Sequence, residues 1–237
     1  MGYSDNTNLT HLLATLADTA SVYGPCAGAF GMEPWHESLQ DALGILRGNM
    51  TAGRFVLEGY DKWEKESLKG EENPLAPYHL TEPRRICSFV GRERTKEPLR
   101  FEGRLLGGCM DCLVNLLGTR FDRTREFTER YGKDGIIWFL EACDLNVFAV
   151  RRAMWQMEEA GWFGNVSGFL FGRPRNGEPL MNLDAYDAVL EVAGPKNVPV
   201  IMDVDLGHLP PMMPIVTGSM AEVAVKGNDI RVEMRCI

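Results

Sequence analysis

Apolar and polar positions follow two different periodicities along this chain. Apolar residues at helical spacing predict helices over residues 9–20, 35–46, 107–117, 147–160 and 184–193. Apolar runs bounded by turn residues predict strands over residues 21–25, 86–90, 99–105, 135–141, 166–172 and 198–203. Residues 215–234 predict a β-hairpin that turns at Gly227-Asn228. Because strands alternate with helices, we expect an α/β fold in which helices cover a sheet.

A polar tract over residues 61–83 separates two blocks of this pattern. It is rich in lysine, glutamate and proline, which indicates an exposed connector. The block before it, residues 1–60, has two predicted helices but only one complete strand, too few for a doubly wound sheet. We therefore interpret residues 1–60 as the tail of a doubly wound domain and residues 84–237 as a layered β/α C-terminal domain.

The composition limits the classes of partner and compartment. A chain of 237 residues with 45% hydrophobic and 24% charged residues can bury one large core or two modest ones. The net charge of −8 disfavours nucleic acid and anionic membranes as partners. No apolar run has the length of a membrane span, and the six cysteines stand in mostly apolar settings that suit reduced thiols. We therefore expect a cytoplasmic protein without a membrane partner.

Ser4 is the first candidate for chemistry. It lies in the run Gly2-Tyr3-Ser4-Asp5, directly before the first predicted helix. A serine at a sharp turn into a helix lies beside backbone N–H groups that can stabilise an oxyanion. Ser4 is therefore a candidate nucleophile.

Glu141 and His208 follow Ser4 in an order that fits an activated serine. Glu141 ends an apolar strand. Its side chain either orients a catalytic histidine, or it caps the following turn or pairs with Arg151 or Arg152. His208 follows a buried strand, where α/β proteins gather functional groups, although an exposed loop histidine is the alternative. Serine, glutamate and histidine together can form a nucleophile system.

The other candidates are weaker. His11 is expected on the surface of the first helix, His36 at a helix start, and His79 in the connector. Cys109-x-x-Cys112 has no second ligand pair at zinc-site spacing, so packing explains it better than metal or redox function. Gly107-Gly108 lacks the rest of a phosphate-loop motif, which favours close backbone approach to a neighbouring element or a ligand.

Several segments, in order, resemble the serine LD-carboxypeptidases, which include muramoyl-tetrapeptide carboxypeptidases and microcin-immunity peptidases. Gly2-Tyr3-Ser4-Asp5-Asn6-Thr7 resembles the nucleophile motif of that family, and Gly207-His208 its histidine loop. The remaining positions with this resemblance are residues 23–25, 103–108, Leu113, 117–119, 137–141, Arg152 and 154–163.

The resemblance implies a Ser4–Glu141–His208 triad that hydrolyses an amide bond. Ser4 would attack, His208 would carry the proton, and Glu141 would orient His208, with the Asp5 backbone N–H as one oxyanion donor. Gly108 and Cys109 would contact a small peptide or peptide-conjugate substrate. The resemblance implies neither a metal nor an organic cofactor, and it implies a homodimer that acts on cell-wall peptides or on a peptidyl-nucleotide antibiotic.

Three departures from the family pattern leave an alternative open. First, the family has roughly a hundred residues before the nucleophile. Second, it often has asparagine at the position of Cys109. Third, it often has acidic and lysine residues where residues 142–146 of this chain read Ala-Cys-Asp-Leu-Asn. The alternative is a catalytically inactive, truncated binding or dimerisation protein. A Cys109/Cys112 redox protein is a third interpretation.

Overall fold

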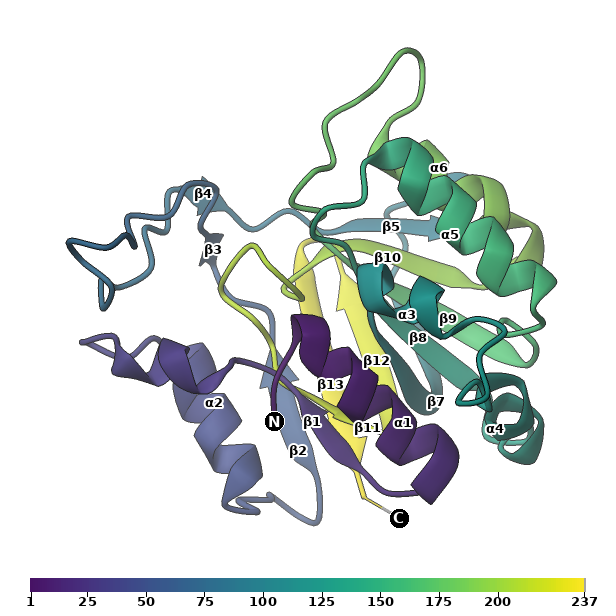
Figure 1. Cartoon of the computed structure of the whole chain (residues 1–237), viewed down its shortest axis with the longest axis horizontal. Coiled ribbons are helices and arrows are strands. Elements are labelled where there is room, and N and C mark those ends of the chain that lie inside the picture. The colour runs from purple at the N-terminus through teal and green to yellow at the C-terminus, as the bar shows by residue number, and fades with distance from the viewer. Residues whose placement is uncertain (237) are drawn as a thin grey trace.

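A computed structural model describes residues 1–236 (Figure 1). Its helices are α1 (Thr7–Ala17), α2 (Glu37–Leu46), α3 (Met110–Leu116), α4 (Thr124–Arg130), α5 (Val147–Glu159) and α6 (Ala185–Ala193), with 3-10 turns η1 (Ser4–Asn6), η2 (Ala27–Gly31) and η3 (Gly194–Lys196). The longer strands are β7 (Leu99–Cys109), β8 (Ile136–Glu141), β9 (Val166–Gly172), β10 (Pro199–Val204), β12 (Met220–Lys226) and β13 (Asp229–Arg235). The shorter strands are β1 (Ser21–Tyr23), β2 (Phe55–Glu58), β3 (Lys62–Trp63), β4 (Glu82–Pro83), β5 (Cys87–Val90), β6 (Glu93–Thr95) and β11 (Ile215–Thr217).

One mixed sheet organises the molecule. Nine strands are ordered β2-β13-β12-β7-β8-β9-β10-β5-β6, and the four central strands β7 to β10 run parallel. The flanking strands are antiparallel to their neighbours, and the predicted hairpin at Gly227-Asn228 joins β12 to β13. The predicted α/β fold class is therefore confirmed.

Two hydrophobic cores cover the two faces of this sheet. In β8, Trp138 and Leu140 point into the core beneath α3, α4, α5 and α6, whereas Ile137 and Phe139 point into the core on the other face. All residues of β8 are buried, as expected for a central parallel strand. In Figure 1, α5 and α6 lie together on one side, while α2 stands on the other side with β2.

The paired glycines lie at the end of a strand, so the prediction that they open a helix is wrong. β7 continues through Gly107 and Gly108 to Cys109, which pairs with Glu141, and α3 begins only at Met110. A Cβ on Gly108 would meet Thr7 Cγ2 at 2.6 Å. The absence of side chains here lets the first turn of α1 pack directly on the strand, which is the close approach to a neighbouring element that the sequence favoured.

The first helix forms as predicted but buries a different face. Leu9 is 59% exposed and Leu16 is 49% exposed, whereas the buried side carries Thr10, His11 and Ala14. The expectation that His11 lies on the surface is therefore wrong. The first turn of α1 contacts β7 closely at Thr7 and Gly108, and His11 further along the helix bonds to the Gly107 carbonyl of the same strand.

The N-terminal block is tied into the rest of the fold. β1 pairs with β11, and β2, which the sequence pattern does not predict, pairs with β13 in the main sheet. The two-residue strands β3 and β4 pair with each other at the base of the connector, which extends away from the sheet in Figure 1. The division into residues 1–60, 61–83 and 84–237 stays a prediction. Within residues 1–236, no helix is both long enough and apolar enough to cross a bilayer.

Candidate active site

Ser4 lies on a sharp turn that leads into the first helix. Tyr3 is extended, with φ −125° and ψ −172°, whereas Ser4 has the left-handed φ of 58°. A non-glycine residue in this region costs about 1–2 kcal/mol, and such strain concentrates at functional sites. Gly2 forms a parallel bridge with Tyr23, which fixes the chain before the turn. Extended chain, strained serine and helix follow one another as in the nucleophile turn of α/β hydrolases.

His208 connects Ser4 with Glu141. Its Nε2 lies 3.1 Å from Ser4 Oγ, and its Nδ1 lies 2.8 Å from Glu141 Oε2. Because a carboxylate only accepts hydrogen bonds, the ring proton lies on Nδ1, and Nε2 is free to accept the Ser4 hydroxyl. The side chain of Glu141 is 1% exposed and that of His208 is 11% exposed. The structure thus brings together the three residues that the sequence separated by 204 positions.

The Glu141 carboxylate is held by residues around it that the sequence analysis did not single out. The Tyr23 hydroxyl donates a 2.6 Å hydrogen bond to Oε1, the oxygen opposite the histidine. A Cβ on Gly207, whose φ is 92°, would lie 2.4 Å from Oε2, so only glycine lets the histidine loop pass this close. The alternative partner Arg151 pairs with Glu191 instead. Nothing in the local sequence pattern distinguishes the Tyr23 hydroxyl from that of any other buried tyrosine.

The Tyr3 ring packs against His208 on the side of the nucleophile turn. The two ring centroids lie 4.9 Å apart in an edge-on arrangement. Burial raises the pKa of the Tyr3 phenol, with the neighbouring Cys26 and Glu141 contributing in the same direction. Tyr3 therefore stays neutral near neutral pH and limits the orientations open to the imidazole.

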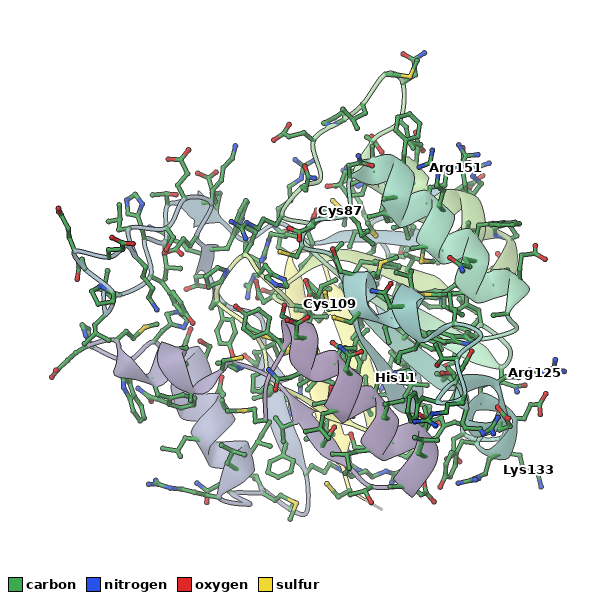
Figure 2. The ribbon with its side chains drawn as sticks, viewed as in Figure 1. His11, Cys87, Cys109, Arg125, Lys133 and Arg151 are labelled. Carbon is green, nitrogen blue, oxygen red and sulfur yellow. The ribbon has the colours of Figure 1, made fainter. Side chains whose placement is uncertain are left out.

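Cys109 and Cys112 lie beneath the nucleophile turn. The Cys109 N–H donates to Thr7 Oγ1 at 3.0 Å, and Cys112 Sγ lies 3.6 Å from the Ser4 carbonyl oxygen. The Cys109 thiol donates to Asp111 Oδ2 at 3.4 Å. The interaction between the two thiols raises the pKa of Cys109 and lowers the pKa of Cys112, while burial adds to the rise at Cys109. Figure 2 labels Cys109 near the N-terminal end of α1. Both cysteines are free and buried.

Asp111 ties the segment after Glu141 to α3. Its carboxylate accepts hydrogen bonds from the N–H groups of Cys143, Asp144 and Leu145 at 2.9, 2.9 and 3.1 Å. The segment that the sequence analysis compared with a family substrate loop is therefore fixed from beneath. The structure, and not the predicted helix over residues 107–117, places Asp111 in the first turn of α3.

The remaining sequence candidates lie at defined places. Asp5 follows Ser4 within η1. The first hydrogen bond of this turn runs from the Asn6 N–H to the Tyr3 carbonyl. The Asp5 N–H therefore lies one residue before the first N–H that is bonded within the turn. His11 is fully buried and bonds to Thr124 Oγ1 at 2.9 Å; burial lowers its pKa to about 4.

Two further histidines lie away from the triad. His36 caps α2 by accepting from the Ser38 N–H, and His79 is exposed in the connector. These roles are structural.

A pocket of about 510 Å³ opens beside His208. Tyr3 and Tyr78 contribute aromatic walls, and Glu64 contributes an acidic side chain. The cations on its wall are Lys65, Lys69 and Arg175. Among residues 1–236, none of these three cations forms an ion pair with an acidic side chain. The pocket can therefore receive an anionic group next to the Ser4–His208 pair.

A strained serine hydrogen-bonded through histidine to a buried carboxylate, at the carboxyl ends of parallel strands, is an arrangement typical of serine hydrolases. The chain belongs to the LD-carboxypeptidase family, because the family model for the LD-carboxypeptidase C-terminal domain matches residues 102–223, slightly more than half of the chain. The family prediction from the sequence is therefore confirmed.

Individual relatives agree with this assignment. The chain is 24% identical over 237 residues to the microcin C7 self-immunity protein MccF of Escherichia coli, covering 98% of this chain and 64% of that protein. The structure of MccF in complex with glutamyl sulfamoyl guanosine superposes with a TM-score of 0.75 at 22% identity, over 100% of this chain and 67% of the other. The chain thus spans somewhat less than two thirds of the curated relative.

Two further solved structures share the fold. An MccF-like protein from Bacillus anthracis has a TM-score of 0.76 at 19% identity, covering 100% of this chain and 67% of that one. Muramoyltetrapeptide carboxypeptidase from Oxalobacter formigenes has a TM-score of 0.66 at 18% identity, covering 99% of this chain and 67% of the other. The fold therefore recurs in both a self-immunity protein and a muramoyltetrapeptide carboxypeptidase.

Proposed function

We propose that this chain is a serine peptidase of the LD-carboxypeptidase type with Ser4 as nucleophile, His208 as base and Glu141 as the group that orients His208. The observation that carries the proposal is the pair of hydrogen bonds at 3.1 Å and 2.8 Å that joins the three side chains. Family membership supports the reaction class, because the matched family consists of carboxypeptidases.

In this mechanism, Ser4 Oγ attacks the carbonyl carbon of an amide bond while His208 Nε2 takes the hydroxyl proton. Glu141 then faces an imidazolium through Nδ1–H and stabilises it from a site that water does not reach. His208 returns the proton to the leaving amine, and a water molecule hydrolyses the acyl-enzyme by the reverse path. The backbone N–H of Asp5 is one donor to the oxyanion, since the start of the helix leaves it without an intrahelical acceptor.

The cationic pocket indicates the class of substrate. Lys65, Lys69 and Arg175 lie on the wall of the pocket that also contains His208. We infer a small peptide or peptide conjugate that carries an anionic group close to the scissile bond. MccF has been solved with glutamyl sulfamoyl guanosine and with aspartyl sulfamoyl adenosine, which are conjugates of this kind. Cell-wall tetrapeptides are the second substrate class to test, with Gly108 and Cys109 as proposed contacts.

The decisive experiment measures hydrolysis of both substrate classes by the whole chain and by Ser4→Ala. We expect the wild type to release an amino acid and Ser4→Ala to lose at least about 10³-fold in kcat/KM. Ser167→Ala is the matched control, because this serine lies on β9 and outside the pocket. Equal turnover in Ser4→Ala and the wild type would refute the triad.

The alternative of a non-catalytic binding or dimerisation protein predicts a different result. It predicts ligand binding by calorimetry without turnover in the wild type. A homodimer and a cytoplasmic location also remain predictions, which light scattering and cell fractionation test.

A further inference from the structure

Three potential metal ligands from separate parts of the chain meet beside Ser4. Cys109 ends β7, Glu141 ends β8, and His208 lies in the loop after β10. One ligand atom of each, a sulfur, a carboxylate oxygen and a ring nitrogen, lies within 4.8 Å of the other two. From this convergence we propose that the chain binds a zinc-like divalent cation at Cys109, Glu141 and His208, and that the bound cation switches the catalytic triad off.

The donor set selects the kind of cation. Thiolate, imidazole and carboxylate are the ligands of Zn²⁺ and of Co²⁺, which substitutes for it, whereas Mg²⁺ and Ca²⁺ require mostly oxygen ligands. Three protein ligands leave the fourth tetrahedral position for water, as in open zinc sites. The thiol proton leaves when the cation binds, whereas the ring proton of His208 moves from Nδ1 to Nε2.

The ligand atoms must shift before they can enclose a cation, because they are spread over distances of up to 4.8 Å. Zinc bonds of about 2.0 Å to nitrogen and oxygen and about 2.3 Å to sulfur place tetrahedral ligands roughly 3.3–3.5 Å apart. His208 Nδ1 and Glu141 Oε2 are 2.8 Å apart, so they must separate by about half an ångström to accept the cation between them. His208 lines the 510 Å³ pocket, which gives a cation access from solvent.

The surroundings favour positive charge at this point. The carboxylate of Asp111, a residue of α3, lies 3.4 Å from Cys109 Sγ and brings negative charge next to the proposed site. The Tyr23 hydroxyl holds the other Glu141 oxygen at 2.6 Å, so Glu141 can turn Oε2 toward a cation without losing this anchor. The competing interpretation is that Cys109 only fills space beneath the nucleophile turn.

Metal binding would change His208 Nε2 from a hydrogen-bond acceptor into a donor. With the cation on Nδ1, the neutral ring carries its proton on Nε2, the atom that lies 3.1 Å from Ser4 Oγ. Nε2 then donates to Ser4 and cannot accept the serine proton. This consequence for hydrolysis rests on the proposed function, whereas the binding of the cation does not.

The test of binding uses Co²⁺ as a coloured probe of the reduced, full chain. We expect a thiolate-to-cobalt charge-transfer band that saturates at one equivalent, that Zn²⁺ removes by competition and that Mg²⁺ leaves unchanged. Cys109→Ser should abolish the band and weaken binding at least about tenfold. The matched control Cys112→Ser, three positions away in the same C-x-x-C motif, should keep the band.

Three results would overturn the site: no charge-transfer band in the wild type, a band unaffected by Cys109→Ser, or a band lost only in Cys112→Ser. If Cys109→Ser does not fold by circular dichroism, zinc-edge X-ray absorption of the wild type decides instead. One sulfur at about 2.3 Å with nitrogen or oxygen neighbours supports the site, and an all-oxygen or all-nitrogen shell refutes it.

Hydrolysis provides the separate test of the switch. Chelated wild-type enzyme should be active, Zn²⁺ should inhibit it in proportion to occupancy of the site, and a chelator should restore activity. A wild type that binds Co²⁺ through Cys109 but never hydrolyses a substrate supports the site and refutes the proposed function. Full activity at full zinc occupancy refutes the switch.

Discussion

Tyr23 donates a 2.6 Å hydrogen bond to Glu141, on the carboxylate oxygen opposite the one that faces His208. The tyrosine is completely buried, and burial raises the pKa of its phenol well above 10, with the Glu141 charge contributing further. The hydroxyl therefore stays protonated and remains a donor at and well above neutral pH. Glu141 is thus fixed from both sides before His208 becomes charged.

Removing the Tyr23 hydroxyl should slow catalysis without affecting substrate binding. Tyr23→Phe removes one donor from a buried carboxylate, a loss of about 1–1.5 kcal/mol that corresponds to roughly tenfold in kcat. KM should stay constant, since Tyr23 lies beneath Glu141 and outside the pocket. Steady-state kinetics on the preferred substrate measures both constants.

Tyr186→Phe is the matched control for Tyr23→Phe. The Tyr186 hydroxyl donates a 2.6 Å hydrogen bond to Asp203, so the same chemical change removes an equivalent tyrosine–carboxylate bond elsewhere. Its kcat should equal that of the wild type. Equal losses of kcat in the two variants would mean that Tyr23 acts through general stability and not through Glu141.

His11 should make the protein less stable in acid. Burial lowers its pKa from 6.5 to about 4, so the unfolded state binds the proton more tightly than the folded state. The stabilisation is complete above pH 6.5 and is lost as the pH falls toward 4, which amounts to about 3 kcal/mol. Urea unfolding at several pH values between 7 and 4 measures this slope.

The variant His11→Gln isolates this effect. Glutamine can still bond to Thr124 but does not titrate, so it should be less stable than the wild type at pH 7 and lose less stability on acidification. His79→Gln changes an exposed histidine and should keep the wild-type slope. An unchanged slope in His11→Gln would refute the assignment.

The burial of His11 illustrates what the sequence pattern could not resolve. Helical spacing predicted α1 and placed His11 on its surface, whereas His11 is buried and Leu9 and Leu16 are exposed. Periodicity finds the stripe with the greatest apolar area. Apolar periodicity does not reveal that α1 packs against Gly108, where only a small side chain fits at the contact.

The residues of the candidate site also divide into those that the sequence can indicate and those that it cannot. Ser4, Glu141 and His208 could be chosen because each follows a recognisable element and because their motifs resemble a family. Tyr23 and Arg175 could not be chosen, since their roles come from contacts between distant segments. β2 was missed because four residues that pair with the last strand give only a short alternation.

Arg175 should determine affinity for anionic substrates. It lines the pocket beside His208, and no acidic side chain within residues 1–236 forms an ion pair with it. Arg175→Gln should lower kcat/KM for a substrate with a free carboxylate by roughly tenfold to a hundredfold, mainly through KM, as expected for a hydrogen bond to a charged group. The same substrate with its carboxylate amidated should be cleaved equally by both enzymes.

Arg151→Gln provides the matched control for charge. Arg151 lies on α5 (Figure 2), pairs with Glu191 and does not line the pocket. Its kinetics should equal those of the wild type at constant ionic strength. An equal loss of kcat/KM in both arginine variants would indicate long-range electrostatic attraction and not a direct contact with Arg175. If Arg175→Gln lowered kcat/KM for the amidated substrate just as much, anion recognition by Arg175 would be refuted.

Gly207 should tolerate no side chain because Glu141 occupies the space. A Cβ there would lie 2.4 Å from Glu141 Oε2, on a backbone with φ 92°. Gly227 has a comparable left-handed φ of 62° but open space around the position of a Cβ. Gly227→Ala therefore measures the backbone strain alone, about 1–2 kcal/mol of stability.

Gly207→Ala should have the same strain and, in addition, displace His208 from Glu141. A displacement of about 1 Å within a catalytic arrangement costs on the order of 10²-fold in rate, so kcat should fall by that amount while Gly227→Ala keeps its activity. Chemical denaturation and steady-state kinetics on both variants separate the two effects. Normal kcat in a folded Gly207→Ala protein would show that the histidine loop adapts, and that contact between Gly207 and Glu141 does not set the position of the base.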